Sequence, residues 1–151
     1  MAADSIEREI VINASRARVW PLLTEPEHVS RWFGDSTEAD LRPGGALAFT
    51  WAGFGSHFGV VERIEPPSFF SYRWARSTGA EPVAGNSTLA EFTLIADGPM
   101  TRLRVVESGF GSLDLSPAER EQAVRDNIEG WRRELDELRA YAELPGFPGS
   151  R

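Results

Sequence analysis

The chain has 151 residues, of which 41% are hydrophobic and 26% charged, and its formal net charge at pH 7 is −7. This composition excludes a disordered or collagen-like chain, and the length suits one ordinary domain. The absence of cysteine excludes disulfides, a thiolate nucleophile and cysteine-bound zinc. With only two histidines we expect neither a metal site nor a cofactor. All 16 basic residues are arginine, so a Schiff-base lysine is excluded as well.

Charge and hydropathy also restrict the partners and the location. The negative net charge argues against nucleic-acid binding, which needs a basic face. The apolar runs are too short to cross a bilayer, so we expect no membrane insertion. The first nine residues, MAADSIERE, are acidic and polar, unlike a secretory signal. We therefore expect a cytoplasmic protein.

The N-terminal part of the chain predicts one strand and two short helices. In residues 5–13 isoleucines alternate with charged residues, which is typical of a strand. Ser15 is a suitable N-cap for a first helix, which Pro21 should kink or shorten. A second short helix over residues 27–33 follows a proline and ends at a glycine.

From residue 37 to residue 108 the apolar period changes to two, which is typical of β-strands. Glycine- and proline-containing turns separate most of the alternating runs. We expect about six antiparallel strands, at residues 37–42, 46–51, 57–65, 69–75, 88–95 and 101–108. An exposed glycine-, serine- and proline-rich loop at residues 77–86 separates the fourth of these from the fifth.

The last predicted element is a long amphipathic helix. Ser116 and Glu119 form a capping box with a proline at the first helical position, and Pro145 marks the end of the helix. Apolar residues recur between them at steps of four and three, which predicts one buried stripe. The stripe consists of Val124, Ile128, Trp131, Leu135, Leu138 and Ala142. One wide sheet and one such helix make a two-layer α+β domain, which tends to leave a cavity between the layers.

Five stretches of the chain occur in the order found in one known family. They are IEREIVINASRARVWPLLTEPEHVSRWF, DLRPGGALAFTW, GVVERIEPPSFFSYRW, TRLRVVESGF and the pair Gly130-Trp131. The chain thereby resembles the AHSA-like branch, named after the activator of the Hsp90 ATPase, of the START-like (SRPBCC) superfamily. The resemblance spans about residues 6–143. It implies the helix-grip fold, with a curved antiparallel sheet of six to seven strands around the C-terminal helix. We expect one domain over residues 1–151, with a flexible tail at 144–151.

The resemblance leaves three hypotheses for function, because this superfamily includes apolar-ligand binders, cyclases, hydrolase-like enzymes and co-chaperones. The first is binding of a small apolar ligand, lipid-like or polycyclic aromatic, in a cavity between the sheet and the long helix. The second is a cyclase or dehydratase acting on such a ligand. The third and weakest is regulation of a chaperone ATPase, because the eukaryotic activator has a further N-terminal domain that this chain lacks. We favour a non-enzymatic function, and a homodimer stays open.

The resemblance also points to an aromatic lining of that cavity. For any single member, filling of the core is the simpler explanation, but together they form an unusually aromatic surface for an apolar ligand. The candidate ligand-binding aromatic residues are Trp32, Phe33, Trp51, Phe58, Tyr72, Trp74, Phe110 and Trp131.

Glu107 is the most informative polar residue, because it follows Leu103 and Val105 on the apolar face of a strand. A carboxylate there is costly unless it is paired or meets water or a ligand. Glu107 is therefore a candidate ligand-binding residue and the one candidate general acid or base, with Tyr72 or Asn127 orienting the substrate. The alternatives are a structural pair with a nearby arginine, or a bulge that turns the side chain outward.

Three further polar residues give weaker signals. Glu62 shares a parity with apolar neighbours, but Val61 is apolar too, so the orientation of the strand is ambiguous. We expect His57 at the surface near a hairpin and His28 on an exposed helix. Neither has a sequence neighbour that would suggest a catalytic triad.

One shoulder of the helical stripe carries small and polar residues. At 100° per residue, Ala123, Asn127 and Gly130 lie together beside Trp131. A glycine inside a helix costs about 1 kcal/mol relative to alanine, so it needs a reason. Either Gly130 and Asn127 form a wall of the ligand pocket, or the helix packs too closely at this point for a Cβ atom.

Overall fold

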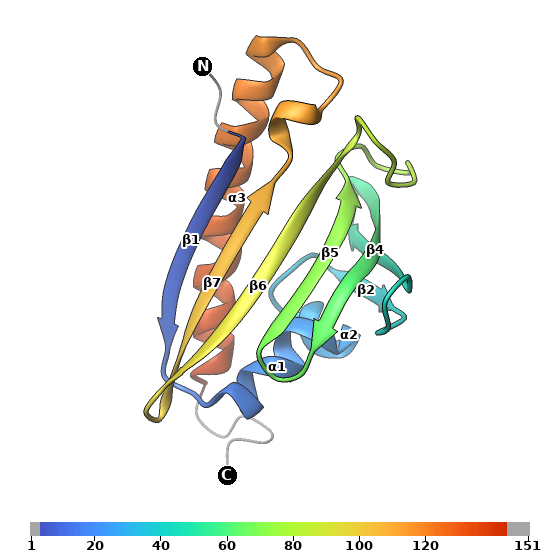
Figure 1. Cartoon of the computed structure of the whole chain (residues 1–151). Helices are drawn as coiled ribbons and strands as arrows, with labels where there is room; N and C mark the ends of the chain where they lie inside the picture. Colours follow the sequence, from blue (N-terminus) through green and yellow to red (C-terminus); the bar gives the residue numbers. More distant parts are fainter. Residues whose placement is uncertain (1–3, 145–151) are drawn as a thin grey trace.

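The computed structural model describes residues 4–144 and shows a curved sheet with one long helix along it (Figure 1). The seven strands are ordered β1-β7-β6-β5-β4-β3-β2, and all neighbours are antiparallel. The strands are β1 (Ser5–Ile12), β2 (Ser36–Ala39), β3 (Ala46–Trp51), β4 (Gly55–Glu65), β5 (Phe69–Ala75), β6 (Ser87–Asp97) and β7 (Met100–Ser108). This arrangement confirms the predicted α+β helix-grip fold.

Two short helices, α1 (Arg16–Thr24) and α2 (Pro26–Val29), connect the two edge strands β1 and β2 (Figure 1). Ser15 caps α1 as predicted, because its side chain accepts a hydrogen bond from the Arg18 amide. Helix α2 is shorter than the predicted 27–33. Beyond Val29 the backbone continues only as a turn, which ends at Gly34 with a φ of +78°.

The predicted hairpin differs at its turn. Strand β2 ends at Ala39 rather than at residue 42, and the following residues fold back onto β4. The Gly45 amide donates to the Arg42 carbonyl, and the Val61 amide donates to the Gly45 carbonyl. Only glycine fits at position 45, because a Cβ there would lie 1.9 Å from the carbonyl oxygen of Asp40.

The long helix α3 (Pro117–Ala142) begins at the predicted capping box and ends near the predicted proline. Its backbone comes closest to β1, α1 and the short 3-10 turn η1 (Phe110–Ser112). Trp131, Leu135 and Leu138 are buried against the sheet. The predicted burial of Ile128 is wrong: its side chain is 49% exposed, because it lies on the flank of α3 that faces solvent.

The inner face of the sheet follows the predicted alternation in β7 but not in β4. Leu103, Val105 and Glu107 are all buried, with exposed fractions of 0%, 1% and 0%. In β4 the register shifts between Val61 and Arg63. Residues of the same parity therefore point to opposite faces of the sheet before and after this bulge. Val61 therefore points inward and Glu62 outward, where Glu62 lies 3.6 Å from Arg73.

The core is an aromatic cluster between α3 and the β3–β5 part of the sheet. Phe33 stacks on Trp131 with a centroid distance of 5.6 Å and an interplanar angle of 13°. Phe49 packs edge to face against the Phe33 ring at a centroid distance of 5.1 Å. Trp74 packs against the same Phe33 ring in a tilted arrangement at 5.6 Å. Because the sheet curves away from α3 on this side, large rings are needed to fill the widening space.

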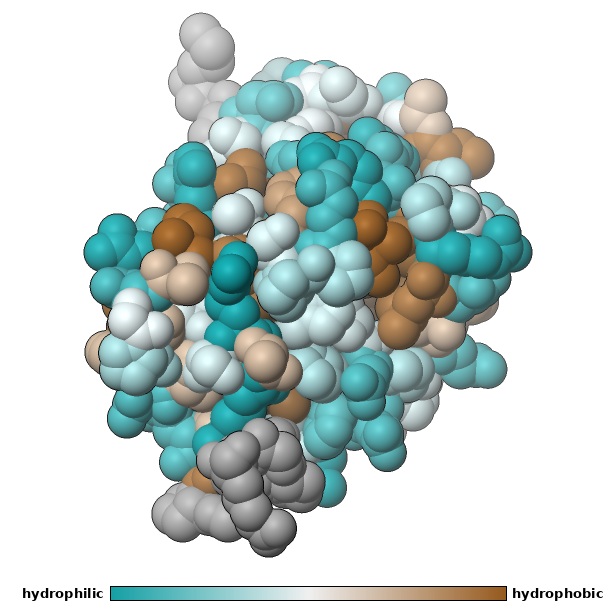
Figure 2. Space-filling view, turned by 60° about the horizontal axis from the view of Figure 1, so that its bottom comes forward, coloured by the Kyte–Doolittle hydropathy of each residue, from teal (hydrophilic) through white to brown (hydrophobic). Residues whose placement is uncertain are grey.

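The surface outside this core is mixed. On the face shown in Figure 2, hydrophobic side chains form small separate groups among hydrophilic ones. None of the described helices has the length and hydropathy needed to cross a membrane. The tail predicted at 144–151 lies, from residue 145 on, outside the described residues.

Candidate functional site

A cleft opens between α3 and the β3–β5 part of the sheet, and it has two adjoining parts. The larger part has a volume of about 190 Å³ and the smaller about 130 Å³. Trp51, Trp74 and Asn127 line both parts, and we call the whole space the aromatic cleft. The larger part is also lined by His57, Ala75, Arg76, Thr88 and Glu107, and the smaller by Phe33, Gly130, Trp131, Arg133 and Glu134.

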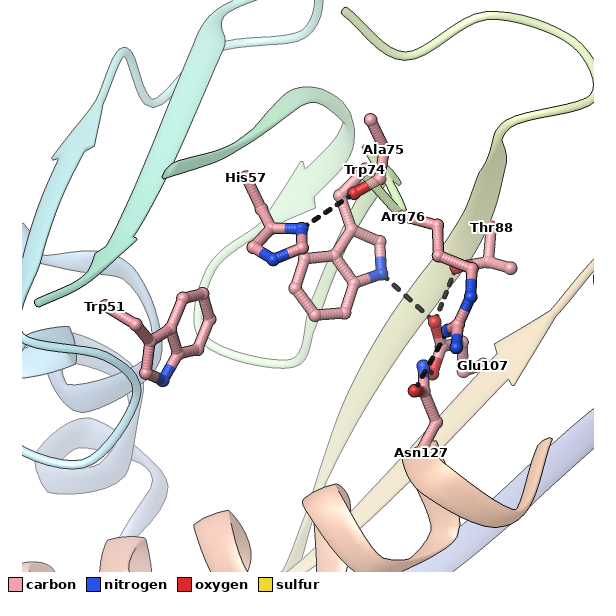
Figure 3. Close-up of a pocket in the computed structure, with 8 residues that line it drawn as sticks. All are labelled: Trp51, His57, Trp74, Ala75, Arg76, Thr88, Glu107 and Asn127. Carbon is pink, nitrogen blue, oxygen red and sulfur yellow. Dashed lines mark hydrogen bonds between the residues drawn. The ribbon is translucent and has the colours of Figure 1, made fainter. Parts of the chain in front are cut away.

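Glu107 forms the floor of the larger part, and its carboxylate accepts four hydrogen bonds from three different elements. Figure 3 draws three of the donors, Trp74, Thr88 and Asn127. Trp131 Nε1 and Asn127 Nδ2, both on α3, each lie 2.8 Å from Oε1. Trp74 Nε1 lies 3.1 Å from Oε2, which also accepts a short hydrogen bond from the Thr88 hydroxyl. Both oxygens are thus engaged twice, which compensates the cost of burying the charge.

The charge of Glu107 has no direct arginine partner among the described residues, contrary to the structural alternative that the sequence suggested. Arg76 is linked to Glu107 through Asn127, since its Nη1 lies 3.3 Å from Asn127 Oδ1. Its Nη2 lies 3.7 Å from the Asp126 carboxylate at the rim. Asn127 therefore connects a half-buried cation to a buried anion, with its amide nitrogen toward Glu107 and its oxygen toward Arg76.

His57 belongs to the cleft, although the sequence placed it at the surface. Its ring lies between Trp51 and Trp74, at centroid distances of 5.5 and 5.9 Å (Figure 3). Its Nδ1 lies 3.1 Å from the carbonyl oxygen of Ala75, which can only accept, so Nδ1 carries the proton. This leaves Nε2 available to a ligand in the cleft.

The bulge in β4 explains why the sequence missed His57. Counting in steps of two back from Ile64, which packs against the core, puts Phe58 inward. The extra residue between Val61 and Arg63 reverses this parity, so His57 and Gly59 share the inner face with Val61. Phe58 instead lies opposite Ala48 on the outer face and does not line the cleft.

The shoulder of α3 is open rather than closely packed. A Cβ atom built at Gly130 would have no neighbour within 4 Å. Glu134 lies one turn further along the same side, and its side chain is only 12% exposed. Burial, together with the nearby charge of Glu137, raises the pKa of Glu134 to about 7, although Arg133 opposes the shift.

The structure brings together Phe33, Trp51, Trp74, Glu107, Asn127, Gly130 and Trp131 of the predicted site. The four other predicted aromatic residues lie elsewhere: Phe58 on the outer face of β4, and Trp32, Tyr72 and Phe110 in the interior. Trp32 is in the core, where its Nε1 donates to the Leu22 carbonyl at 2.7 Å. Phe110 belongs to a separate buried cluster with Leu113, Ala123 and Val124 near the N-terminal end of α3.

Tyr72 is buried behind the cleft and faces Phe49 and Phe92. Its burial, and to a smaller extent the charge of Glu107, raise the pKa of the Tyr72 phenol well above its usual range. The phenol therefore stays protonated. Among the described residues its hydroxyl has no hydrogen-bond partner.

One cluster of possible metal ligands is present in the described part of the chain, at Glu25, Glu27 and His28 near α2. It is far in sequence from the strands of the aromatic cleft, and both glutamates are exposed. His28 Nδ1 is already hydrogen-bonded to the Tyr141 hydroxyl at 2.8 Å. This cluster therefore does not extend the chemistry of the cleft.

The family model described as "Activator of Hsp90 ATPase homolog 1-like protein" matches residues 13–143. The chain belongs to this family. The match covers both the α1–α2 connection and α3, and hence every element that lines the aromatic cleft. No curated protein matches the sequence.

Solved structures with this AHSA1-like fold agree. Protein MLL2253 from Mesorhizobium loti is 20% identical, with a TM-score of 0.76 over 90% of this chain and 94% of its own. The solution structure of CalU16 from Micromonospora echinospora is 28% identical in sequence, with a TM-score of 0.69 over 95% of this chain and 69% of its own. The Aha1 dimer from Colwellia psychrerythraea is 20% identical, with a TM-score of 0.74 over 94% of this chain and 98% of its own.

Proposed function

We propose that the aromatic cleft binds a small apolar ligand between the sheet and α3, and that this binding is the function of the protein. The observation that carries the proposal is the open space at Gly130, bounded by Phe33, Trp51 and Trp131. Protein interiors are normally packed without such gaps. A glycine that weakens α3 and leaves open space beside the half-buried Trp51 ring is explained if a ligand occupies that space.

The size and lining of the cleft favour a ligand built of aromatic rings. A cavity of about 150 Å³ lined by apolar groups is enough for benzene, so each part of the cleft accommodates about one ring. A ligand of two or more rings would span both parts and contact Trp51 and Trp74, which line both. His57 Nε2, Arg76 and Asn127 converge on the larger part, so we expect the polar group of the ligand at that end.

The same geometry favours binding over catalysis by Glu107. A general base needs a free lone pair within reach of the substrate proton, and both oxygens of Glu107 are engaged by two donors each. We therefore assign Glu107 to the support of the cleft. We propose that this binding takes place in the cytoplasm.

Quenching of tryptophan fluorescence tests the proposal, because Trp51, Trp74 and Trp131 line the cleft. The probe is 2-naphthol, a neutral two-ring molecule with one polar group. Gly130→Leu should fill the smaller part of the cleft and weaken 2-naphthol binding by about tenfold or more, as expected for losing a buried apolar ring contact.

Glu121→Leu is the matched control, since it adds the same side chain at an exposed position of α3 outside the cleft. Equal affinities for the wild-type protein and Gly130→Leu would overturn the proposal, as would no binding of any ring system. Mass spectrometry of the recovered probe separates binding from conversion. Stimulation of a chaperone ATPase that Gly130→Leu leaves intact would instead support the regulatory hypothesis.

A further inference from the structure

A second groove lies on the other side of Trp131, between α3 and β1. It has a volume of about 190 Å³ and is lined by Ile6, Glu7, Arg8, Val105, Ile128 and Trp131. On α3, Ile128 lies about 60° to one side of Trp131, whereas Asn127 and Gly130 lie on the other side. Trp131 therefore separates this groove, which we call the β1 groove, from the aromatic cleft.

Arg8 is the unexpected member of the β1 groove. It occupies the inward parity of β1, between Ile6 and Ile10, and pairs in register with the buried Val105. A position flanked by isoleucines on the inner face would ordinarily be apolar. Its Nε is buried and has no hydrogen-bond partner, and Arg8 forms no ion pair within the described residues.

The neighbouring acids do not neutralise Arg8, because other arginines engage them, including Glu7, which lines the groove. Glu7 accepts two hydrogen bonds from Arg104, at 2.8 and 3.0 Å. Glu9 lies 3.8 Å from Arg102. On α3, the carboxylate of Glu129 is held by Arg132. Arg8 is therefore a positive charge at an apolar groove with no anion assigned to it.

Leaving a buried guanidinium nitrogen without an acceptor costs free energy, and so does leaving Ile128 half exposed above an apolar groove. One ligand would remove both costs: an apolar body under Ile128 and against Trp131, with an anionic oxygen on Arg8. We propose that the β1 groove binds a small amphipathic carboxylate, an alkyl or one-ring body with a single carboxylate that pairs with Arg8.

The volume sets the size of this ligand. A cavity of about 150 Å³ holds benzene, so the groove fits one ring or a short alkyl chain. Arginine is suited to the headgroup because its planar fork can bind a carboxylate through two parallel hydrogen bonds. The site is independent of the proposed function of the aromatic cleft, with Trp131 as the shared wall.

Isothermal titration with octanoate and with cinnamate tests the site and separates an alkyl from an aromatic body. Octanol and cinnamyl alcohol are the neutral counterparts. We expect at least one carboxylate to bind with an affinity about tenfold or more above that of its alcohol, and this advantage to disappear in Arg8→Gln. Arg8→Lys should retain part of the advantage, since it keeps the charge.

Arg125→Gln is the matched control, because it removes one positive charge from an exposed site of α3 outside the groove. Ile128→Glu is a second variant at an exposed position, and its carboxylate should compete for Arg8 and weaken octanoate binding. Gly130→Leu should leave octanoate binding unchanged, so failure at the β1 groove and failure at the aromatic cleft are distinguishable.

Three results would overturn the proposal. The first is an unchanged affinity for both carboxylates in Arg8→Gln, and the second is no binding of either by the wild-type protein. The third is a wild-type dimer in solution that dissociates in Ile128→Glu and binds neither carboxylate. That third result would assign the groove to an interface between two copies of the chain.

Discussion

Glu107 shows how the partners of one residue decide its role. Two indole N–H groups, one amide and one hydroxyl converge on its carboxylate. All four are donors, so the site is complementary to an acceptor-only group with two oxygens. The carboxylate therefore holds β5, β6 and α3 at fixed distances around the larger part of the aromatic cleft.

Glu107→Gln should destabilise the protein, because on either side the new NH₂ group would face an indole N–H, of Trp131 or of Trp74, which can only donate and loses its acceptor. We expect a loss of about 2–4 kcal/mol in the free energy of unfolding, measured by urea denaturation. Glu91→Gln, on the neighbouring β6 strand with the opposite parity to Ala90, is the control and should change stability by less than about 0.5 kcal/mol. Equal stability of Glu107→Gln and the wild-type protein would contradict the structural role of this carboxylate.

Glu134 gives the protein a pH dependence with a definite sign. Burial and Glu137 raise its folded-state pKa from 4.5 to about 7, so the folded state binds this proton more tightly than the unfolded state. The contribution to stability is therefore fully present below about pH 4.5 and is lost as the pH rises through 7.

Glu134→Gln stays neutral and should keep this contribution at high pH. At about pH 8 we expect the variant to be more stable than the wild-type protein by on the order of 1–3 kcal/mol, and at about pH 4 the difference should be small. Thermal denaturation across this range measures it. A constant difference at all pH values would show that packing, not the proton, distinguishes the two side chains.

At the scale of elements, α3 combines a strong start with a weak middle. The capping box at Ser116 and Glu119 satisfies the first amides of the helix. Gly130 lowers the helix propensity at its centre, although no neighbouring atom there requires a residue without a Cβ. The weak point coincides with the wall of the aromatic cleft. This coincidence is what connects the helix sequence to ligand binding.

Gly130→Ala should stabilise the unliganded protein by about 0.5–1 kcal/mol, because the new methyl group meets no neighbour within 4 Å and alanine favours the helix. Thermal denaturation measures the gain. Gly59→Ala in β4 is the contrasting control, since its Cβ would lie 2.9 Å from the Arg73 carbonyl oxygen and should reduce stability. A loss of stability in Gly130→Ala would show that the helix closes on this site.

For the whole molecule, the sheet predicts a gradient of local stability. Strands β6 and β7 lie inside the sheet and pair along most of their length on both sides. Strand β2 has four residues, lies at an edge and pairs only with β3. Local opening should therefore be easiest at β2, beside the aromatic cleft.

Native-state hydrogen exchange tests this gradient. We expect the paired amides of β7 to exchange at least about 100-fold more slowly than those of β2, because opening β7 requires unfolding of the core. Addition of a cleft ligand should slow exchange in β3 and β4 more than in β1. Uniform exchange across the sheet would show that it opens as a single unit.

Much of the architecture could be predicted because the signals for it are local. The alternation in β7, the capping box of α3 and the proline and glycine turns depend on neighbouring residues in the chain. The order of these elements, together with the five stretches resembling the AHSA-like family, was enough to predict the helix-grip fold.

The sequence by itself thus determined the elements, the family and the presence of Glu107 on an inner face. The tertiary structure decided what those residues do. The four donors around Glu107 come from segments far apart in the chain, and a one-residue bulge in β4 puts His57 rather than Phe58 at the cleft. Contacts between distant segments leave no period in the sequence. Neither the environment of Glu107 nor the lack of a partner for Arg8 Nε among residues 4–144 could therefore be predicted from it.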